Sequence, residues 1–473
     1  MADIDLDSLR ALQRPVVAVQ GLGFVGAAMC AAVASSRTTD GLPRYTVIGV
    51  DLPTSEGQRR IHAVNRGEFP FPTVDGRLRE VFAQAHEVGN LLACDNTDVY
   101  GTAAVVIVDV HLDVQGQGRQ ASVDFTGFRQ AIASIGAAIQ PGSLVIVETT
   151  VPPGTCSSVV LPVLNASLRQ RGLPSDSVLV AHSYERVMPG EQYFDSIVNY
   201  WRVYSGHTAP AGDACEAFLA SIINVKDYPL TRLASTVASE TAKVLENSFR
   251  AMTIAFMEEW GRFAEAAGFD LFQVVDAIRV RPTHSNMRTP GFGVGGYCLT
   301  KDPLLALVGA RDFFQRSDLD FPCCRQAIET NSSMPLSTVS RLRAILGGLS
   351  GKRIILMGVS YRSGVADTRY SPSQQFVDAV RNDGGEVLCH DPLVGHWDEL
   401  DEDVPIELPS ASNVDAVVAA VAHPEYRLLD FAAWMNDAKP VVLDANGVFS
   451  DVQRATLRAL GCRVESIGRG DGL

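Results

Sequence analysis

Short apolar runs alternate with helical stretches along the N-terminal part of the chain. Runs of this kind are typical of strands in a parallel sheet that is covered on both faces. Because helical segments lie between the runs, the pattern predicts a doubly wound α/β domain. The five runs are PVVAVQG from Pro15, YTVIGVD from Tyr45, AAVVIVDV from Ala103, SLVIVETT from Ser143 and SVLVAHS from Ser177.

The pattern changes between Leu233 and Ile278. The stretch SETAKVLENSFRAMTIAFMEEWGRFAEAAG keeps apolar residues at helical spacing over a length that exceeds a crossover helix, so it predicts a central spine. Its broad apolar surface favours burial against a partner subunit. That surface includes Phe249, Ile254, Phe256 and Trp260.

Alternating apolar runs return after this stretch, in GKRIILMGVS from Gly351 and then in GGEVLCHD, DAVVAAV and KPVVLDA. The predicted fold class is therefore α/β, with two doubly wound domains joined by a long central helix. The expected domains are residues 1–210, 211–334 and 335–473.

Composition narrows the class of protein. A chain of 473 residues exceeds what one compact core usually serves. Its 40 basic and 54 acidic residues give a formal net charge of −14, which disfavours general binding to nucleic acid or to an anionic membrane. No apolar segment reaches the ~20 residues of a membrane span, and the acidic start MADIDLDSLR predicts no signal peptide.

The nine cysteines are scattered along the chain, without C-x-x-C spacing or histidine partners. This distribution disfavours both a zinc site and a disulfide framework. We therefore expect no metal, and a reducing, cytoplasmic location.

A glycine-rich turn follows the first apolar run. VVAVQGLGFVG sets Gly21, Gly23 and Gly26 in G-x-G-x-x-G spacing between a predicted strand and a predicted helix. Glycines permit the tight turn, and the N-terminus of the helix offers N–H groups to a pyrophosphate. A structural turn is the alternative, but the preceding strand favours a dinucleotide site in a Rossmann-like domain.

Asp51 stands at the end of the next predicted strand. An acidic side chain there accepts hydrogen bonds from the adenosine ribose and repels a 2′-phosphate, so NAD is favoured over NADP. The polar insert SSRTTDGLPR, residues 35–44, accounts for the long spacing from the glycines. Arg59 and Arg60 leave the opposite preference open, since an arginine nearby could accept that phosphate.

One cysteine lies in a second glycine-rich stretch, GFGVGGYCLTKDP, from Gly291 to Pro303. A thiolate can add to an aldehyde carbonyl, and hydride loss from the adduct gives a thioester that water cleaves to an acid. Lys301 could favour the thiolate of Cys298, and Asp302 could orient water. A small buried cysteine beside a solvated Lys-Asp pair is the structural alternative.

These stretches resemble the UDP-glucose/GDP-mannose dehydrogenase family of nucleotide-sugar dehydrogenases over nearly the whole chain. GFGVGGYCLTKD is similar to the family's active-site loop, and GLGFVG to its cofactor turn. The other similar segments are ETTVPPGT from Glu148, ERVMPGE from Glu185, SETAKVLENSFRA in the central helix and GVSYRSGVADTRYSP from Gly358.

The resemblance implies a four-electron oxidation of a sugar C6 alcohol to a carboxylate, with two NAD+ used in sequence. It implies that Cys298 is the nucleophile that carries the thiohemiacetal and the thioester. Lys243 and Asn247, four residues apart, would stabilise charge on the reacting oxygen. A solvated helix face is the structural alternative for that pair.

Three further catalytic residues follow from the same resemblance. Asp302 and Thr150 would position the hydrolytic water, and Glu185 would be a general base, unless Glu185 only forms a surface ion pair with Arg186. The implied cofactor contacts are Gly21, Gly23, Phe24, Val25, Gly26, Asp51, Thr150 and Lys301. The implied substrate contacts are Glu185, Arg186, Val187, Lys243, Asn247, Arg281, Phe292, Gly295 and Arg369.

The resemblance also implies one role for each expected domain. The first would bind NAD, the central helical domain would carry dimerisation and active-site residues, and the C-terminal domain would bind the UDP-sugar. Lys352 and Arg369 would meet its phosphates. A homodimer or higher homo-oligomer is implied, built on the central helix.

Several positions depart from the family pattern. Tyr184 stands where a proline usually precedes the glutamate of the sugar loop, and Tyr370 replaces an acidic residue. The usual V-P-T-P turn is replaced by DVHLD, residues 109–113, with His111 near the expected cofactor. ERVMPGE is more similar to enzymes for UDP-N-acetylhexosamines and GGYCLTKD to those for UDP-glucose, so both sugars stay open.

Two other functions remain open. A two-electron β-hydroxyacid dehydrogenase also pairs a Rossmann domain with a helix bearing Lys and Asn, although it needs neither Cys298 nor a second α/β domain. A non-catalytic NAD- or sugar-binding protein would be expected to lose Cys298, Lys243 or Asp302. All three are present.

Overall fold

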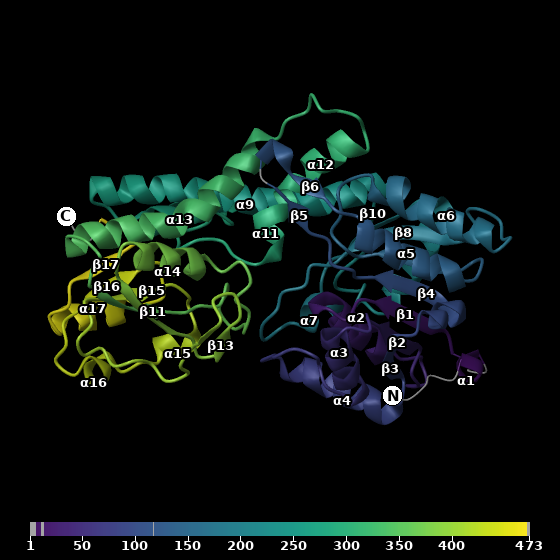
Figure 1. The fold of residues 1–473 in the computed structure, drawn as a ribbon, viewed down its shortest axis with the longest axis horizontal. Coiled ribbons are helices and arrows are strands. Elements are labelled where there is room, and N and C mark those ends of the chain that lie inside the picture. Colours follow the sequence, from purple (N-terminus) through teal and green to yellow (C-terminus); the bar gives the residue numbers. More distant parts are fainter. Residues whose placement is uncertain (1–5, 11–13, 117, 471–473) are drawn as a thin grey trace. The chain divides into compact units, whose positions relative to one another are not determined.

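The computed structural model describes residues 6–10, 14–116 and 118–470, which divide into two compact units (Figure 1). Unit 1 comprises residues 1–245 and 304–320, and unit 2 comprises residues 246–303 and 321–473. The three-domain division remains a prediction. Its expected boundary at residue 335 falls inside helix α13 (Pro322–Leu346).

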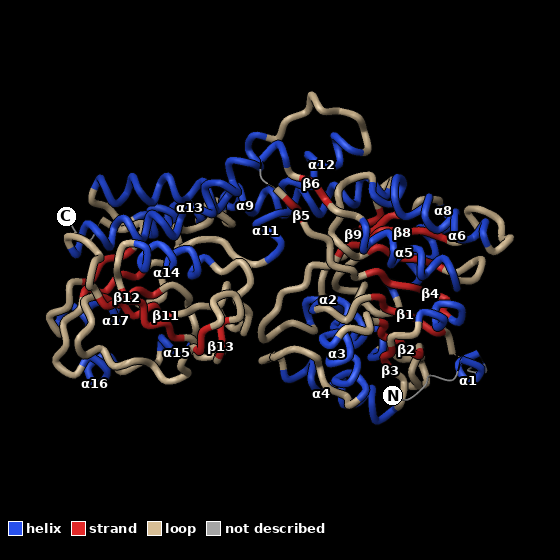
Figure 2. The backbone as a smooth tube through the Cα atoms, viewed as in Figure 1, coloured by secondary structure: helices blue, strands red, loops and turns tan. Residues whose placement is uncertain are grey.

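Unit 1 is built on an eight-stranded sheet with the order β10-β9-β8-β7-β4-β1-β2-β3. Figure 2 shows strands in red. All neighbouring strands are parallel except β8 and β9. The strands are β1 (Val16–Gln20), β2 (Thr46–Val50), β3 (Leu91–Cys94), β4 (Ala103–Val108), β7 (Leu144–Val147), β8 (Leu179–Tyr184), β9 (Val203–Gly206) and β10 (Thr231–Arg232).

Helices cover both faces of this sheet. One buried cluster packs α2, α3, α4 and α8 on one face, and a second cluster packs α5 and α6 on the other. The sequence order reverses at β1, which lies between β2 and β4. Ligands of such sheets bind at the carboxyl ends of the strands at this reversal. The helices are α2 (Phe24–Ser35), α3 (Ser55–Asn65), α4 (Gly76–Val88), α5 (Thr126–Ala138), α6 (Leu161–Gln170) and α8 (Ala209–Ala220).

Smaller elements complete unit 1. The strands β5 (Val114–Gln115) and β6 (Ser122–Val123) form an antiparallel pair. The remaining helices are α1 (Leu6–Arg10), α7 (Asp195–Val198) and α12 (Leu305–Asp312).

Helix α9 (Thr236–Ala267) is the predicted spine, 32 residues long, and the division between the units falls within it after Leu245. It ends before Gly268, whose positive φ of 76° suits a residue without a Cβ. The chain then turns into α10 (Leu271–Arg279).

Unit 2 contains the second predicted sheet, with five parallel strands in the order β12-β11-β15-β16-β17. Helices α13 and α14 pack on one face, and α16 and α17 on the other. The strands are β11 (Arg353–Met357), β12 (Glu386–His390), β15 (Ala416–Ala419), β16 (Val441–Asp444) and β17 (Val464–Ser466). Besides α10, α13 and the C-terminal part of α9, the helices of unit 2 are α11 (Tyr297–Lys301), α14 (Pro372–Asn382), α15 (Pro424–Arg427), α16 (Phe431–Met435) and α17 (Asp451–Ala459). A short antiparallel pair joins β13 (His396–Trp397) and β14 (Glu402–Asp403).

The α/β fold with two doubly wound parallel sheets and a long helix between them in sequence is confirmed. Among the described residues, no helix is long and apolar enough to cross a membrane.

Candidate active site and cofactor site

The glycine turn after β1 has a conformation that requires glycine. Gly21 has a φ of +97°, and a Cβ on Gly21 would overlap the carbonyl oxygen of Asp109. A Cβ on Gly26 would overlap the carbonyl oxygen of Gly21. A Cβ on Gly23 would meet nothing within 4 Å, so the backbone there is open to a ligand.

Helix α2 begins directly after this turn. Its N-cap is Gly23, which supplies no side-chain cap for the first N–H groups of the helix. Phe24 stacks on Phe71 with 4.0 Å between the ring centroids, and Val25 packs against the core of unit 1. The turn therefore fits the pyrophosphate of a dinucleotide at a helix N-terminus.

Asp51 follows β2, and its carboxylate is held in place. It accepts hydrogen bonds from the backbone N–H of Leu22 at 3.3 Å and of Leu52 at 2.8 Å. Arg60 Nη1 lies 3.0 Å from its Oδ2, and Arg60 also pairs with Glu56. Because Arg60 already pairs with two carboxylates, it does not favour a cofactor that carries a 2′-phosphate over one that does not.

Arg59, the other arginine that could favour NADP, also has a hydrogen-bond partner within the protein. Arg59 donates a hydrogen bond to the carbonyl oxygen of Pro70 at 3.1 Å.

Glu185 and Lys243 lie together in unit 1. The Lys243 Nζ donates to the backbone oxygen of Glu185 at 2.8 Å and lies 3.3 Å from its Oε1. The Glu185 carboxylate also accepts from the N–H of Val187. Both side chains are almost buried, at 8% and 11% exposure. Glu185 is thus nearly buried and pairs with Lys243, which differs from the alternative of a surface ion pair with Arg186.

Tyr184 lies between two cations. The Lys243 Nζ is 5.5 Å from the centroid of its ring, and the Arg186 guanidinium is 5.4 Å from it. Arg186 also donates to the Tyr184 hydroxyl at 3.2 Å and to the carbonyl oxygen of Trp201 at 2.9 Å. The residue that replaces the usual proline thus positions the side chains around Glu185.

The buried face of α9 in unit 1 is polar. Glu240, 1% exposed, accepts hydrogen bonds from the N–H groups of Gly154 and Cys156. It thereby anchors the PPGT loop that follows Thr150. Burial raises the pKa of Glu240 to about 7, although the backbone donors oppose that rise.

Cys298 is exposed in the second position of the short helix α11. Cys323 is the other exposed cysteine, whereas five of the nine are buried. Burial raises the pKa of the Cys30, Cys156 and Cys215 thiols, which keeps those thiols protonated and unreactive. Cys298 is therefore accessible to a substrate in a way that the buried thiols are not.

The glycines before Cys298 pack tightly on the loop that follows β11. A Cβ on Gly295 would come within 2.7 Å of Tyr361 Cβ and of the Tyr370 carbonyl oxygen. A Cβ on Gly296 would lie 2.9 Å from the Tyr361 ring. Tyr361 is partly buried beside Asp367 and Cys298. Its burial, and then the charges of Asp367 and Cys298, raise the pKa of its phenol to about 12.

Arg369 lies in this same loop, between β11 and α14, and contacts the cysteine loop. It holds Asp367 through two hydrogen bonds of 2.9 and 2.7 Å, and its guanidinium lies 4.8 Å from the centroid of the Tyr297 ring. Tyr297 in turn meets Tyr370 edge-on at 4.9 Å. The predicted phosphate contact is thus engaged with a carboxylate next to the cysteine loop.

Asn247 and Asp302 are joined inside unit 2. The Asn247 Nδ2 donates to Asp302 Oδ2 at 2.7 Å, and both residues are buried. Lys301 Nζ lies 3.4 Å from Asp302 Oδ1, so the two side chains form an ion pair. Lys243 precedes Asn247 by one turn of α9, and both side chains are buried. The alternative of a solvated helix face for Lys243 and Asn247 is therefore excluded.

The predicted substrate contacts fall into separate groups. Unit 1 brings together Glu185, Arg186, Val187 and Lys243, whereas unit 2 holds the cysteine loop with Arg369 and the Asn247–Asp302 pair. Arg281 is exposed at the start of a short 3-10 helix. Phe292 is 2% exposed and packs on Phe376, so its side chain belongs to the core. Lys352 pairs with Asp415 at 2.9 Å.

Two residues of the site, Glu240 and Tyr361, were not predicted from the sequence. Glu240 precedes Lys243 by three residues, and that helical spacing of polar side chains was a usable signal. Tyr361 carries no such signal, because its place against Gly296 depends on the packing of two loops that are distant in sequence.

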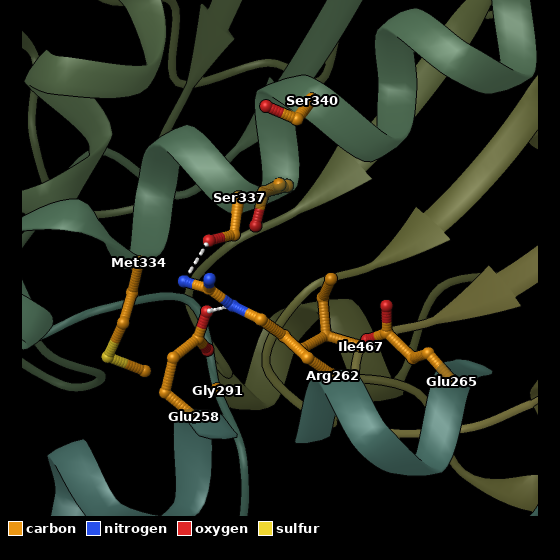
Figure 3. Close-up of a pocket in the computed structure, with 9 residues that line it drawn as sticks. Glu258, Arg262, Glu265, Gly291, Met334, Ser337, Ser340 and Ile467 are labelled. Carbon is orange, nitrogen blue, oxygen red and sulfur yellow. Dashed lines mark hydrogen bonds and ion pairs between the residues drawn. The ribbon is translucent and has the colours of Figure 1, made fainter. Parts of the chain in front are cut away.

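A cavity of about 240 Å³ lies elsewhere in unit 2 (Figure 3). Arg262 extends across it, with its Nε 2.9 Å from Glu258 Oε1 and its Nη2 2.9 Å from Ser337 Oγ. None of the predicted site residues lines this cavity. Glu258 pairs with Arg262 and Glu265 pairs with Arg341, so each charged side chain that lines the cavity has a partner.

Three segments match models of one protein family. Residues 16–222 match the NAD binding domain of the UDP-glucose/GDP-mannose dehydrogenase family. Residues 237–333 match its central domain, and residues 355–451 match its UDP binding domain.

Individual relatives are similar to this chain over nearly its full length. The UDP-N-acetyl-D-mannosamine dehydrogenase of Pyrococcus horikoshii is 29% identical over 463 residues, covering 96% of this chain and 99% of that protein. The protein of the same name from Methanocaldococcus jannaschii is 27% identical and covers 92% of each chain. A solved structure of the UDP-D-ManNAc dehydrogenase from P. horikoshii has a TM-score of 0.79 at 27% identity, covering 96% of this chain and 100% of that chain.

Proposed function

The chain belongs to the UDP-glucose/GDP-mannose dehydrogenase family of NAD-dependent oxidoreductases, and from that premise we propose that its substrate is a UDP-N-acetylhexosamine. UDP-N-acetyl-D-mannosamine is the first candidate. The reaction is the four-electron oxidation of the C6 alcohol to the uronic acid.

The choice of sugar rests on one observation. The two relatives described above are named UDP-N-acetyl-D-mannosamine dehydrogenases and match the chain nearly end to end. The segment ERVMPGE, which resembles enzymes for UDP-N-acetylhexosamines, supports the same choice.

NAD bound at the glycine turn supplies the hydride acceptor for both oxidation steps. The residues fit the group, because Gly23 leaves the backbone open, α2 begins at the turn, and Asp51 is fixed for a ribose. Phe24, Val25 and Gly26 would flank the pyrophosphate, and Thr150 and Lys301 complete the proposed contacts.

In this proposal, Glu185 and Lys243 promote oxidation of the C6 alcohol. The Glu185 carboxylate accepts the proton of the C6 hydroxyl, directly or through water. Lys243 donates to the backbone of Glu185 and carries a positive charge that stabilises the developing oxyanion, a role that Asn247 shares. Arg186 and Val187 contact the sugar from the same segment.

Cys298 is the proposed nucleophile in the oxidation of the C6 aldehyde. Its thiolate adds to the C6 carbonyl, the resulting thiohemiacetal loses a hydride to become a thioester, and water then releases the acid and the thiol. Asp302 orients that water together with Thr150. The proposal is supported by the exposure of Cys298 and by the buried, hydrogen-bonded position of Asp302.

Binding of the nucleotide is assigned to unit 2. Residues 355–451 match the family's UDP binding domain. Arg281 and Arg369 are the proposed contacts to phosphate or sugar, and Gly295 and Phe292 contribute through backbone on the cysteine loop.

The substrate assay compares UDP-N-acetyl-D-mannosamine with UDP-N-acetyl-D-glucosamine, UDP-glucose and GDP-mannose. We expect the highest kcat/KM for UDP-N-acetyl-D-mannosamine, with two NADH formed per sugar consumed. A yield of one NADH would contradict the four-electron reaction. Turnover of UDP-glucose alone would contradict the proposed sugar.

The variant Cys298→Ser tests the nucleophile, with Cys323→Ser as the matched control because Cys323 is also exposed. Cys298→Ser should lose acid formation or stall as an ester that is hydrolysed slowly. Cys323→Ser should retain the wild-type rate. Undiminished turnover in Cys298→Ser would rule out the covalent mechanism.

We also propose that the working form is a homodimer or higher homo-oligomer built through α9, located in the cytoplasm. The exposed apolar face of α9 supports the assembly. The nine free cysteines suit a reducing compartment.

A further inference from the structure

Two carboxyl groups face each other beneath the glycine turn of unit 1. Asp109 follows β4 and Glu148 follows β7, and these parallel strands pair Val108 with Val147. The next residue on each strand is therefore an acid, and both point to the sheet face that carries Ile107 and Ile146. Asp109 is partly buried and Glu148 is 2% exposed, and one carboxyl oxygen of each, Asp109 Oδ2 and Glu148 Oε2, is buried.

One arginine, Arg202, offers a positive charge to this pair of carboxyl groups. Arg202 is ion-paired with Glu148 Oε1, and both side chains are almost fully buried. Among the described residues, Asp109 Oδ2 and Glu148 Oε2 have no N–H or O–H donor. One proton held between the two acids supplies the donor that both oxygens lack and leaves one negative charge for Arg202.

The proton belongs on Asp109, because Arg202 contacts Glu148 directly. The groups that face Asp109 are Glu148, Glu185 and Arg202, with the Cys30 thiol on α2. Burial, followed by the charges of Glu148 and Glu185, raises the pKa of Asp109 well above its usual range, and Arg202 opposes the rise.

Asp109 also forms part of the floor of the glycine turn. Its carbonyl oxygen is the group that a Cβ on Gly21 would strike, and its Cβ lies 3.1 Å from the position of a Cβ on Gly26. Its N–H donates to the carbonyl oxygen of Gln20 at 2.9 Å. An ionised Asp109 would set a buried negative charge directly under the N-terminus of α2, where a diphosphate binds.

We propose that Asp109 is held as a neutral carboxylic acid and that its neutrality is a condition for tight dinucleotide binding. The inference rests on the dinucleotide turn proposed above. It assigns a function to the DVHLD segment that replaces the family's usual V-P-T-P turn. Asp109 is a positioning residue that acts through the turn, without contacting the cofactor.

The pH dependence has a definite sign. Below the pKa of Asp109 the acid is neutral and dinucleotide affinity is at its maximum. As pH rises through that pKa, the new negative charge repels the diphosphate and affinity falls. By linkage, binding at such a pH draws one proton back onto Asp109.

The test measures NADH dissociation constants from pH 6 to pH 10 for the wild type, Asp109→Asn and Asp113→Asn. Asparagine is neutral and nearly isosteric with the protonated acid. Asp113 is exposed in the same segment, so its variant removes the same formal charge at the surface. We expect affinity to fall about five- to tenfold at high pH in the wild type and in Asp113→Asn, but not in Asp109→Asn.

Calorimetry of NADH binding to the wild type, in buffers that differ in ionisation enthalpy, gives a second readout that needs no variant. Proton uptake at high pH supports the proposal, and its absence overturns it. Equal pH profiles in the wild type and Asp109→Asn, whether flat or sloping, also overturn it while leaving the cofactor site intact. Absence of NADH binding in the wild type at every pH would instead contradict the cofactor site, and this inference with it.

Discussion

At the scale of single residues, the hydrogen bond between Asn247 and Asp302 joins two predicted catalytic groups. Replacing Asn247 by Ala removes the donor from a buried carboxylate and should cost about 1–3 kcal/mol of unfolding free energy. It should also lower kcat, because Asp302 loses its fixed orientation. Urea denaturation and steady-state kinetics measure the two effects.

A double-mutant cycle isolates that hydrogen bond from the rest of the packing. Asn247→Ala, Asp302→Ala and the double variant should show a coupling energy of at least about 0.5 kcal/mol. Additive losses of stability would mean that the two side chains act independently.

The residues that could be predicted from sequence are those whose chemistry is tied to a local motif. Gly21, Gly23 and Gly26 follow a strand at fixed spacing, and Cys298 follows a glycine run. The engagement of Arg369 with Asp367 and the burial of Phe292 could not be predicted, because both depend on how separate loops pack.

At the scale of elements, α9 combines a buried polar stripe with an exposed apolar one. Glu240 is buried with its pKa raised to about 7, so the folded state binds a proton that the unfolded state loses near pH 4.5. Its contribution is fully present below pH 4.5 and is lost as pH rises toward 7. The loss amounts to about 3 kcal/mol at most.

The variant Glu240→Gln tests this titration. Its unfolding free energy should fall less between pH 5 and pH 8 than that of the wild type, since glutamine does not ionise. Glu259→Gln, an exposed change on the same helix, should keep the wild-type profile. Parallel profiles for the wild type and Glu240→Gln would show that Glu240 does not titrate in this range.

Strands and helices could be predicted wherever the apolar pattern was long. Every predicted strand is present, because each apolar run lies between polar or turn-forming residues. The short strands β3, β9, β10 and β17 of the two main sheets are not predicted, because two to four residues carry too little pattern.

At the scale of the whole molecule, the order of segments along the chain was predictable, and the proposed assembly rests on the exposed surface of α9. Six large apolar side chains on this helix are 40% to 65% exposed, far more than a monomer usually leaves on one element. They are Leu245, Phe249, Met252, Phe256, Trp260 and Phe263.

The oligomer proposed above therefore predicts that charge on this face separates the subunits. Phe256 and Trp260 meet edge-on at 6.2 Å and would bury about 150–250 Å² each against a partner. Light scattering should give the wild type a multiple of its 50.8 kDa chain mass, and the double variant F256E/W260E the mass of a single chain. Leu428→Glu introduces one such negative charge at a residue that is 85% exposed and lies outside α9, so it should leave the mass unchanged. A monomeric wild type, or an F256E/W260E variant with undiminished mass, would show that this face does not hold the subunits together.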